Sequence, residues 1–285
     1  MNRFQEIIQQ CPKDWSKSLP TAEDEKTKKN NPEVERNHNA VIDTANDVTV
    51  RGFDMWRLRD AAFLGTDIID VYMNILQKRN DKRVTSNPNL QRSRFLGGFF
   101  ADMLAQNNTY DYTRVRGWTK RFNVFSYNVL FFPVNLYSVH WTLLVINLRD
   151  KEMRFYDSMP SLYPNVPIKW FTYFKEWLKD EFRDKVSSSS SSSSSSSTSN
   201  NDDEFGVEKF KLFDSSSGNT TPYNHMIDVP EQLGSDCGVC TIVNADFLGD
   251  DIHTPLDIVY DPREDVNKNW RTKIGTDVLR GHLLY

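Results

Sequence analysis

The stretch G-S-D-C-G-V-C, Gly234 to Cys240, holds two of the three cysteines in this chain of 285 residues. A turn signal at Gly234 and Asp236 leads directly into an apolar run, Thr241 to Leu248, that can form a helix. Cys237 is therefore predicted to lie at or just before a helix N-terminus, where unpaired N–H groups and the helix dipole favour thiolate over thiol. A thiolate attacks carbonyl carbon atoms, so Cys237 is a candidate nucleophile that requires a histidine as its base.

His140 is the one of the five histidines that begins a strongly apolar stretch, residues 140–147, which is predicted to be a strand. Residues 152–157 alternate polar and apolar side chains and predict the next strand, which ends at Asp157. If the two strands form a hairpin, His140 and Asp157 become cross-strand neighbours, and the carboxylate can orient the imidazole and stabilise imidazolium. Taken singly, each residue has an ordinary explanation, either turn chemistry or an exposed histidine. The pairing by register is what makes them candidates.

Gln232 is a further candidate because it lies five residues before Cys237. Its side-chain amide could donate a hydrogen bond to an oxyanion that forms at the nucleophile. A glutamine in a loop is more often simply solvated, so this indication is weak on its own.

Cys240 gives the C-G-V-C spacing that redox pairs and half of a zinc site share. A structural zinc site would need two more ligands at similar spacing, and a redox pair would need a thioredoxin-like βαβ pattern; the sequence offers neither. We therefore predict that Cys240 is a small buried residue of the helix, and we predict no metal and no cofactor. Cys11 lies in a segment predicted to be disordered and is a poor candidate nucleophile.

Composition narrows the class of protein. The net charge of −4 gives no basic footprint, which argues against nucleic acid as a partner. No apolar run approaches the ~18 residues of a membrane span, and the N-terminus lacks the apolar region of a signal peptide. Three cysteines, two of them three residues apart, do not form a disulfide framework. We expect a soluble protein of the nucleus or the cytoplasm.

The predicted domain organisation is a disordered N-terminal arm, residues 1–48, followed by one catalytic domain, residues 49–285. A Ser-rich loop insertion at about 186–204 contains an unbroken run of serines, Ser187 to Ser197. Such a segment buries too little apolar surface to order itself, and long surface insertions cost little free energy.

Other elements follow from periodicity and turn signals. Predicted helices cover residues 57–78, 168–182 and 270–284, and predicted strands cover 48–50, 129–134 and 205–213. The N-cap of the helical region around Ile68 is predicted at Thr66 or Asp67. The pair Gly97-Gly98 interrupts the apolar run Phe95 to Leu104, in which Phe99, Phe100, Met103 and Leu104 indicate a second helix.

Four segments of the chain resemble the SUMO-specific (sentrin) protease family, the Ulp-type cysteine peptidases, from about residue 50 onward. Their sequences here are F-L-G-T-D-I-I-D-V-Y-M-N-I-L (Phe63 to Leu76), R-G-W-T-K (Arg116 to Lys120), V-H-W-T-L-L-V-I-N-L-R-D-K-E-M-R-F-Y-D-S-M (Val139 to Met159) and L-G-S-D-C-G-V-C (Leu233 to Cys240). All four stand in the family's order, with His before Asp before Cys. Papain-like enzymes carry Cys before His, so the order argues against them.

The resemblance implies an α+β cysteine-protease fold of the adenain type, with a central mixed sheet flanked by helices and the nucleophile at a helix N-terminus. It also implies that Cys237 is the nucleophile, His140 the general base and acid, Asp157 the orienting carboxylate and Gln232 the oxyanion donor. Trp141 would cover a narrow tunnel around the substrate's C-terminal Gly-Gly, which fits the physics because only glycine lets a backbone pass between close aromatic walls.

The chain departs from the family's pattern at two places. Phe63 stands where the family usually has Trp, and Gly65-Thr66 replaces Asn-Asp in the segment that follows. The spacing from Gln to Cys is five residues, where six is usual. Either the loop is one residue shorter and Gln232 still reaches, or Glu231 occupies the oxyanion position. An anionic Glu231 would repel the developing oxyanion, which favours Gln232.

The predicted function is a thiol protease or isopeptidase that cleaves after the C-terminal Gly-Gly of SUMO, in precursor maturation or in deconjugation from target lysines. Expected partners are SUMO or a related ubiquitin-like protein and its conjugates, and we expect a monomer. Three alternatives stay open at this point. They are a protease for another ubiquitin-like modifier, a catalytically weak SUMO-binding module, and acetyl transfer by a Cys-His-acid site.

Overall fold

The structure is a computed structural model, and it describes residues 41–43, 48–58, 62–189, 205–214, 225–226, 232, 234–250 and 266–281. Within these residues a mixed sheet of six strands runs in the order β3-β4-β5-β6-β7-β8. Its strands are β3 (Ser93–Phe95), β4 (Val129–Leu136), β5 (His140–Asn147), β6 (Glu152–Tyr156), β7 (Lys211–Asp214) and β8 (His225–Met226). Two hairpins join β4, β5 and β6 in antiparallel order, whereas β3, β7 and β8 run parallel to their neighbours.

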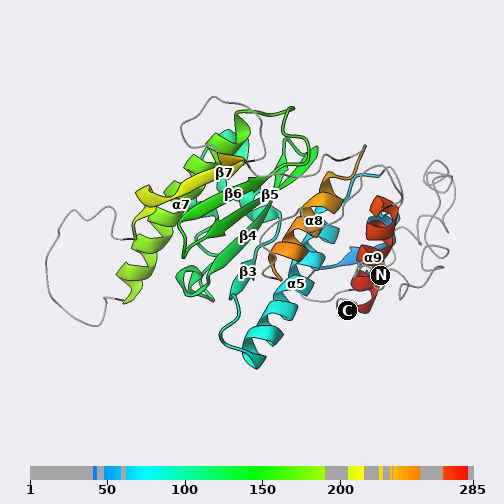
Figure 1. The fold of residues 1–285 in the computed structure, drawn as a ribbon, viewed down its shortest axis with the longest axis horizontal. Coiled ribbons are helices and arrows are strands. Elements are labelled where there is room, and N and C mark those ends of the chain that lie inside the picture. The colour runs from blue at the N-terminus through cyan, green and yellow to red at the C-terminus, as the bar shows by residue number, and fades with distance from the viewer. Residues whose placement is uncertain are drawn as a thin grey trace, which may run out of the picture.

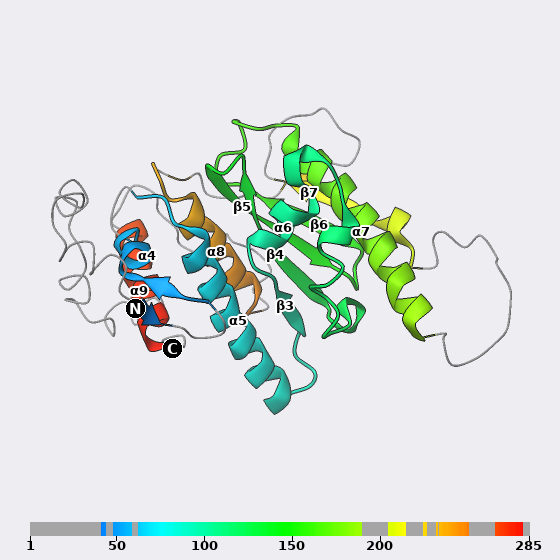
Figure 2. The ribbon, with the colours of Figure 1, turned by 180° about the vertical axis from the view of Figure 1, so that it is seen from behind.

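Helices cover both faces of this sheet, which explains why β4 and β5 are apolar almost without interruption (Figures 1 and 2). One face carries α5 (Thr66–Ser86), α8 (Cys237–Leu248) and α9 (Val266–Arg280), and the other carries α6 (Phe99–Leu104) and α7 (Val166–Ser189). No helix of the described residues is both long enough and apolar enough to cross a bilayer. The predicted fold class, a mixed sheet flanked by helices, is confirmed.

The two layers of helices enclose two separate hydrophobic cores. Along β5, Leu143 and Val145 point into the core beneath α8 and α5. Their neighbours Leu144 and Ile146 point into the core beneath α6 and α7. This alternation is the period of two that a strand imposes on its side chains.

A small second sheet lies before the main one in the chain. Strand β1 (Val41–Asp43) pairs in antiparallel order with β2 (Val50–Arg51), and α4 (Gly52–Trp56) follows directly. Strand β1 therefore precedes residue 49, where the sequence placed the start of the catalytic domain. The rest of the predicted arm, apart from Val48, lies outside the described residues, and so does the predicted Ser-rich insertion beyond Ser189.

The first predicted helix starts later than expected, and the second is confirmed as α6, Phe99–Leu104. Helix α5 begins at Thr66 with Gly65 as its N-cap, so the predicted cap lies one or two residues too late. Phe95, the first residue of the apolar run that precedes α6, belongs to β3, where it pairs with Phe131 of β4.

The predicted strand 205–213 is shorter than expected. Residues Val207–Lys209 form a 3-10 turn, and only Lys211–Asp214 pairs with β6. The other 3-10 turns of the described residues are Gln106–Asn108, Tyr112–Arg114 and Val124–Ser126. The predicted strands 129–134, 140–147 and 152–157 and the helices near 168–182 and 270–284 are confirmed, with the bounds given above.

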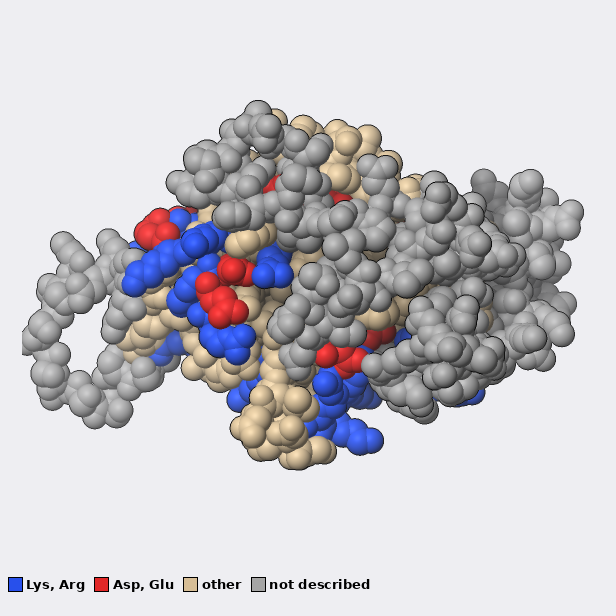
Figure 3. Space-filling model, viewed as in Figure 1, with Lys and Arg blue, Asp and Glu red and all other residues tan. Residues whose placement is uncertain are grey.

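Charged side chains of both signs lie next to one another over the part of the surface where α7 runs (Figure 3). Lys175 Nζ and Lys179 Nζ lie 2.6 and 2.8 Å from the two carboxylate oxygens of Glu208. These pairs lower the pKa of Glu208 to about 2, through its hydrogen bonds with the two lysines. The side chain of Glu208 is half exposed, so the pairs contribute little to stability.

Candidate active site

The turn between β4 and β5 sets the position of His140. Leu136 and His140 are paired across the two strands, and Val139 N donates to Leu136 O over 3.0 Å. Tyr137 and Ser138 have φ angles of 54° and 62°, in the left-handed region that ordinary residues rarely adopt. This tight turn makes His140 the first residue of a rigid, buried strand.

His140 and Asp157 are in direct contact. Nε2 of His140 lies 2.7 Å from Oδ1 of Asp157, and both side chains are buried. The same carboxylate oxygen accepts a hydrogen bond from Met159 N over 2.8 Å, which fixes the orientation of the acid. Because Asp157 engages Nε2, the other ring nitrogen, Nδ1, is left for the thiol.

The sequence predicted His140 and Asp157 to be cross-strand neighbours. In the structure they are diagonal neighbours and do not lie directly opposite one another. The β5–β6 ladder ends with the pair Leu143 and Tyr156. Continued by one residue, this register places Asp157 opposite Thr142, which lies on the same side of the strand as His140. A diagonal pair on one face is within reach of a side chain as long as histidine.

Burial opposes the charged imidazolium and is the largest single influence on the pKa of His140. Hydrogen bonds with Asp157 and Cys237, and the negative charges of these partners, act in the opposite direction. Together they raise the pKa of His140 from 6.5 to about 9. At neutral pH the imidazole is therefore protonated and can hold a thiolate at Cys237 by charge.

Cys237 is the first residue of α8 and is fully buried. The backbone N–H groups of the first turn of α8 and the helix dipole point toward this end, as the sequence predicted. Cys240 lies one turn further along the same helix, also buried, and both residues are free thiols. Among the described residues, no group of three or more His, Cys, Asp or Glu side chains is arranged to hold a metal ion.

Gln232 is buried beside the end of β6. Its backbone N donates to Ser158 O over 3.1 Å, and its Oε1 accepts from Ser158 Oγ over 2.6 Å. Its Nε2 donates to Gly234 O over 2.8 Å, at the turn that leads to Cys237. Gln232 thus joins the loop of Asp157 to the loop of Cys237. Glu231, the alternative for the oxyanion position, lies outside the described residues.

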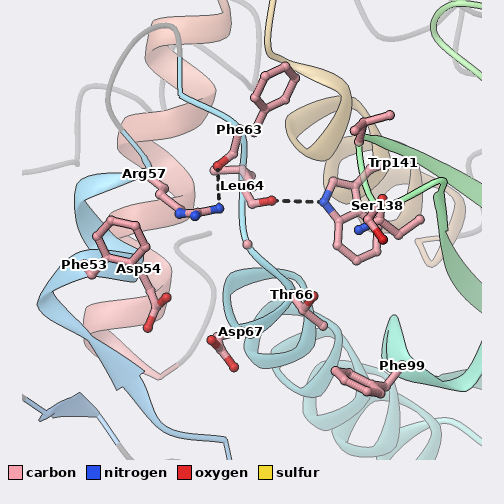
Figure 4. A pocket seen from close by; sticks show the side chains of 13 residues that line it. Phe53, Asp54, Arg57, Phe63, Leu64, Thr66, Asp67, Phe99, Ser138 and Trp141 are labelled. Carbon is pink, nitrogen blue, oxygen red and sulfur yellow. Dashed lines mark hydrogen bonds between the residues drawn. The ribbon is translucent and has the colours of Figure 1, made fainter. Parts of the chain in front are cut away.

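A pocket of about 720 Å³ opens beside Trp141, between α4, the start of α5 and the β4–β5 turn (Figure 4). Phe63, which is 53% exposed, and Trp141, which is 3% exposed, both line it. Trp141 Nε1 donates to Leu64 O over 3.0 Å, so the indole is held against the segment that carries Phe63. The remaining lining residues are Phe53, Asp54, Arg57, Leu64, Gly65, Thr66, Asp67, Phe99, Asn135, Ser138 and Val139.

Two glycines allow close approaches around this pocket. A Cβ atom on Gly98 would lie 2.7 Å from Cη2 of Trp141. A Cβ atom on Gly238, next to Cys237, would lie 2.8 Å from Cβ of Leu64. Both distances are shorter than carbon atoms tolerate, so these positions accept only glycine without movement of their neighbours.

The structure therefore brings His140, Asp157 and Cys237 together and places Phe63 and Trp141 on one pocket. Sequence reasoning missed Ser158 and Gly98. The Gly97-Gly98 pair was noticed only as an interruption of an apolar run, although such a glycine pair also indicates a close backbone approach. Nothing in the sequence singled out the hydroxyl of Ser158.

The family model that matches this chain is the Ulp1 protease family, C-terminal catalytic domain, over residues 62–255. The chain is 26% identical to human sentrin-specific protease 2 over 212 residues, which are 74% of this chain and 30% of that protein. It is 25% identical to the ubiquitin-like-specific protease ESD4 of Arabidopsis thaliana over 237 residues, 81% of this chain and 42% of that protein. The chain thus spans less than half the length of these relatives.

Solved structures with this fold include the C-terminal Ulp1 protease domain in complex with Smt3, the yeast ortholog of SUMO. The TM-score is 0.65 at 19% identity, covering 99% of this chain and 96% of that one. The Ulp1-like SUMO protease catalytic domain of Chaetomium thermophilum gives a TM-score of 0.56 at 18% identity, over 95% of this chain and 90% of that one. The fold of the chain is that of these domains.

Proposed function

Because the chain belongs to the Ulp1 protease family through that family's C-terminal catalytic domain, we propose that it is a cysteine-type peptidase that cleaves after the C-terminal Gly-Gly of a SUMO-type modifier. The observation that carries the proposal is the position of His140, whose Nε2 lies 2.7 Å from Asp157 Oδ1 and whose pKa is raised by its interactions with both Asp157 and Cys237. A thiol, an imidazole and a carboxylate in this order form a nucleophile with its base and its orienting acid.

In the first step, the thiolate of Cys237 bonds to the carbonyl carbon of the last glycine. The tetrahedral intermediate collapses as the C–N bond breaks, and the leaving amine takes a proton from the imidazolium of His140. The product is a thioester between Cys237 and the modifier. Water then gives a proton to His140 and attacks the thioester, and the C–S bond breaks. This step restores the thiolate–imidazolium pair and releases the modifier's carboxylic acid, which loses its proton to the solvent.

Asp157 acts through the imidazole. Its carboxylate holds Nε2, so that Nδ1 faces the thiol, and it stabilises the positive charge that His140 carries before the amine leaves. The bond from Met159 N holds the carboxylate in place.

Gln232 supplies the oxyanion donor in this proposal. One N–H of its side-chain amide donates to Gly234 O, and the second N–H is the group assigned to the oxyanion. A backbone N–H at the start of α8 is the second donor. The bond to Ser158 Oγ supports this role because it fixes which end of the amide carries the hydrogens.

The pocket beside Trp141 is assigned to the modifier's tail. A Gly-Gly backbone has no side chains to obstruct its passage under an indole ring that is itself packed against Gly98. Phe63 forms an exposed aromatic wall of the same pocket. Both reactions of such an enzyme, precursor maturation and cleavage of an isopeptide bond, present this same tail.

A panel of modifiers that carry a C-terminal vinyl sulfone, namely SUMO, ubiquitin and a further ubiquitin-like protein, tests the proposal. We expect the SUMO probe to label the wild type fastest and to leave Cys237→Ala unlabelled. Faster labelling by another modifier would assign the enzyme to that modifier. If wild type and Cys237→Ala bind SUMO alike and neither turns over a fluorogenic SUMO substrate, the protein is a binding module.

A further inference from the structure

Arg271 of α9 is a buried cation with an unusually complete set of partners. Its Nε and Nη2 lie 2.9 and 2.6 Å from Oδ1 of Asp236, and Nη2 also lies 3.2 Å from Ser235 O. On its other side, Nη1 donates to Arg57 O over 3.0 Å and Nη2 to Ala62 O over 2.9 Å. Only 2% of Arg271 is exposed. These partners come from two segments that lie far apart in the chain.

The first of these segments is the turn that presents the nucleophile. Asp236 directly precedes Cys237 and is the N-cap of α8, yet its side chain makes no capping hydrogen bond to that helix. The carboxylate is instead held by the guanidinium of Arg271. A carboxylate next to the nucleophile disfavours a thiolate unless its charge is balanced, and Arg271 carries the balancing charge.

The second segment leads from α4 to α5 and forms one wall of the pocket. Ala62, which Arg271 binds, is followed by Phe63 and Leu64. Leu64 O receives the hydrogen bond of Trp141, and Gly238 of α8 packs directly against the Leu64 side chain. A shift of this segment would therefore move this wall of the pocket relative to the first turn of α8.

We infer that Arg271 is a positioning residue that holds the nucleophile turn and the Phe63–Leu64 segment in a fixed relation to one another. It touches no reacting atom; it acts through Asp236 and through backbone carbonyls. Arg271 lies outside residues 62–255, which the family model covers. The inference deepens the proposed function and rests on it for the identity of the nucleophile.

Lys273, two residues further along α9, is the matched control. It is also buried, but it binds Asp277 Oδ2 over 2.7 Å, the hydroxyl of Tyr72 over 2.9 Å and Asp246 Oδ2 over 3.4 Å. These partners lie where α9 meets α5 and the C-terminal part of α8, and none of them belongs to the nucleophile turn or the pocket wall. Loss of this cation should disturb the fold without displacing Cys237.

The experiment compares Arg271→Gln with Lys273→Gln in the full chain. Two rates are measured per folded molecule, with the folded fraction taken from near-ultraviolet circular dichroism. The first is kcat/KM on a fluorogenic SUMO substrate. The second is alkylation of Cys237 by iodoacetamide, read by peptide mass spectrometry, which requires no modifier and separates Cys237 from the other two cysteines.

We expect Arg271→Gln to lower both rates by about 10- to 100-fold, since a displacement of about 1 Å at a nucleophile costs that much. The double variant Asp236→Asn/Arg271→Gln should recover part of the alkylation rate, because no unbalanced carboxylate then lies beside Cys237. Lys273→Gln should lower the melting temperature and leave both rates within threefold of the wild type. Equal losses in Arg271→Gln and Lys273→Gln, or a change below threefold in Arg271→Gln, would overturn the inference.

If Arg271→Gln does not fold, Arg271→Lys tests the positioning role instead. An ammonium group keeps the charge beside Asp236 but cannot bind the carboxylate and the carbonyls on both sides at once. Slowing of alkylation by threefold or more supports the positioning role, and a smaller change contradicts it. A wild type that is alkylated rapidly but inert toward every modifier probe would reject the proposed function and leave the Arg271 comparison valid.

Discussion

The imidazole of His140 and the carboxylate of Asp157 touch at 2.7 Å although the two residues are diagonal, not opposite, across β5 and β6. Asp157 lies one residue beyond the last paired position of the β5–β6 ladder. The carboxylate can therefore accept from Met159 N and meet the imidazole at the same time. At the strand end, the backbone before Asp157 is fixed by β6, and the carboxylate can still reach both His140 Nε2 and Met159 N.

The pH dependence of activity should report the raised pKa of His140. Activity requires imidazolium, so we expect kcat/KM to fall as the pH rises through about 9. Asp157 raises this pKa against the effect of burial, so Asp157→Asn should move the alkaline fall to lower pH and reduce kcat. If kcat/KM of Asp157→Asn falls at the same alkaline pH as that of the wild type, the assignment is contradicted.

The raised pKa of His140 also makes the stability of the fold depend on pH. A base whose pKa is higher in the folded state than in the unfolded chain stabilises the fold below the unfolded value and ceases to do so above the folded one. The His140 contribution should thus be complete below pH 6.5 and disappear as the pH rises through about 9. Urea denaturation of wild type and His140→Gln at pH 6 and pH 10 measures it. The difference between the two proteins should shrink at the higher pH.

Replacement of the nucleophile should separate chemistry from packing. Cys237→Ala should abolish turnover while the fold and the binding of the modifier persist, because one sulfur atom is removed from a buried position. Cys240→Ala, which removes the same atom one turn further along α8, should keep most of the activity. Active-site titration and thermal unfolding of both variants check this. Equal loss of activity in both would point to packing of α8 as the cause.

Gln232→Ala should lower kcat by about 10²- to 10³-fold, the range typical of a lost oxyanion donor. Its control is Ser158→Ala, which removes the hydroxyl that orients the amide but leaves the amide itself in place. The loss in Ser158→Ala should be smaller, with KM unchanged in both variants. A raised KM with unchanged kcat in Gln232→Ala would assign the glutamine to substrate binding.

Gly98→Ala should damage the pocket because the new methyl group would meet the indole of Trp141 at 2.7 Å. The indole has little room to move, since its Nε1 is bound to Leu64 O. We expect a reduced kcat/KM and a cost in stability of about 1–3 kcal/mol, as for other overpacked sites. Gly117→Ala is the control, because a Cβ atom there meets nothing within 4 Å. Steady-state kinetics and thermal melts of both variants test the difference.

The parts of the site that were predictable from sequence are those that local pattern determines. The hairpin of β5 and β6 followed from two short strands and a polar turn, and it brought His140 and Asp157 together. The position of Cys237 followed from a turn signal directly before a helical run. The short edge element β3 could not be predicted because its residues become a strand only by parallel pairing with β4, whose partner no local pattern identifies.

Contacts between segments that lie far apart in the chain could not be predicted from the sequence either. Arg271 and Asp236 are 35 residues apart, and the bond from Trp141 to Leu64 O spans 77 residues. A backbone carbonyl carries no signature in the sequence, so the hydrogen bond from the indole of Trp141 to Leu64 O could not be predicted. The N-cap at Gly65 was missed because glycine caps a helix by its backbone conformation alone.

The sulfur and the imidazole belong to different halves of the protein's interior. Cys237 is packed in the core beneath α8 and α5. The ring of His140 lies against Tyr163, which packs on the core beneath α6 and α7, at a centroid distance of 6.1 Å. The proposed pair of thiol and base thus depends on the packing of both cores, so a substitution that loosens either core is expected to separate Cys237 from His140.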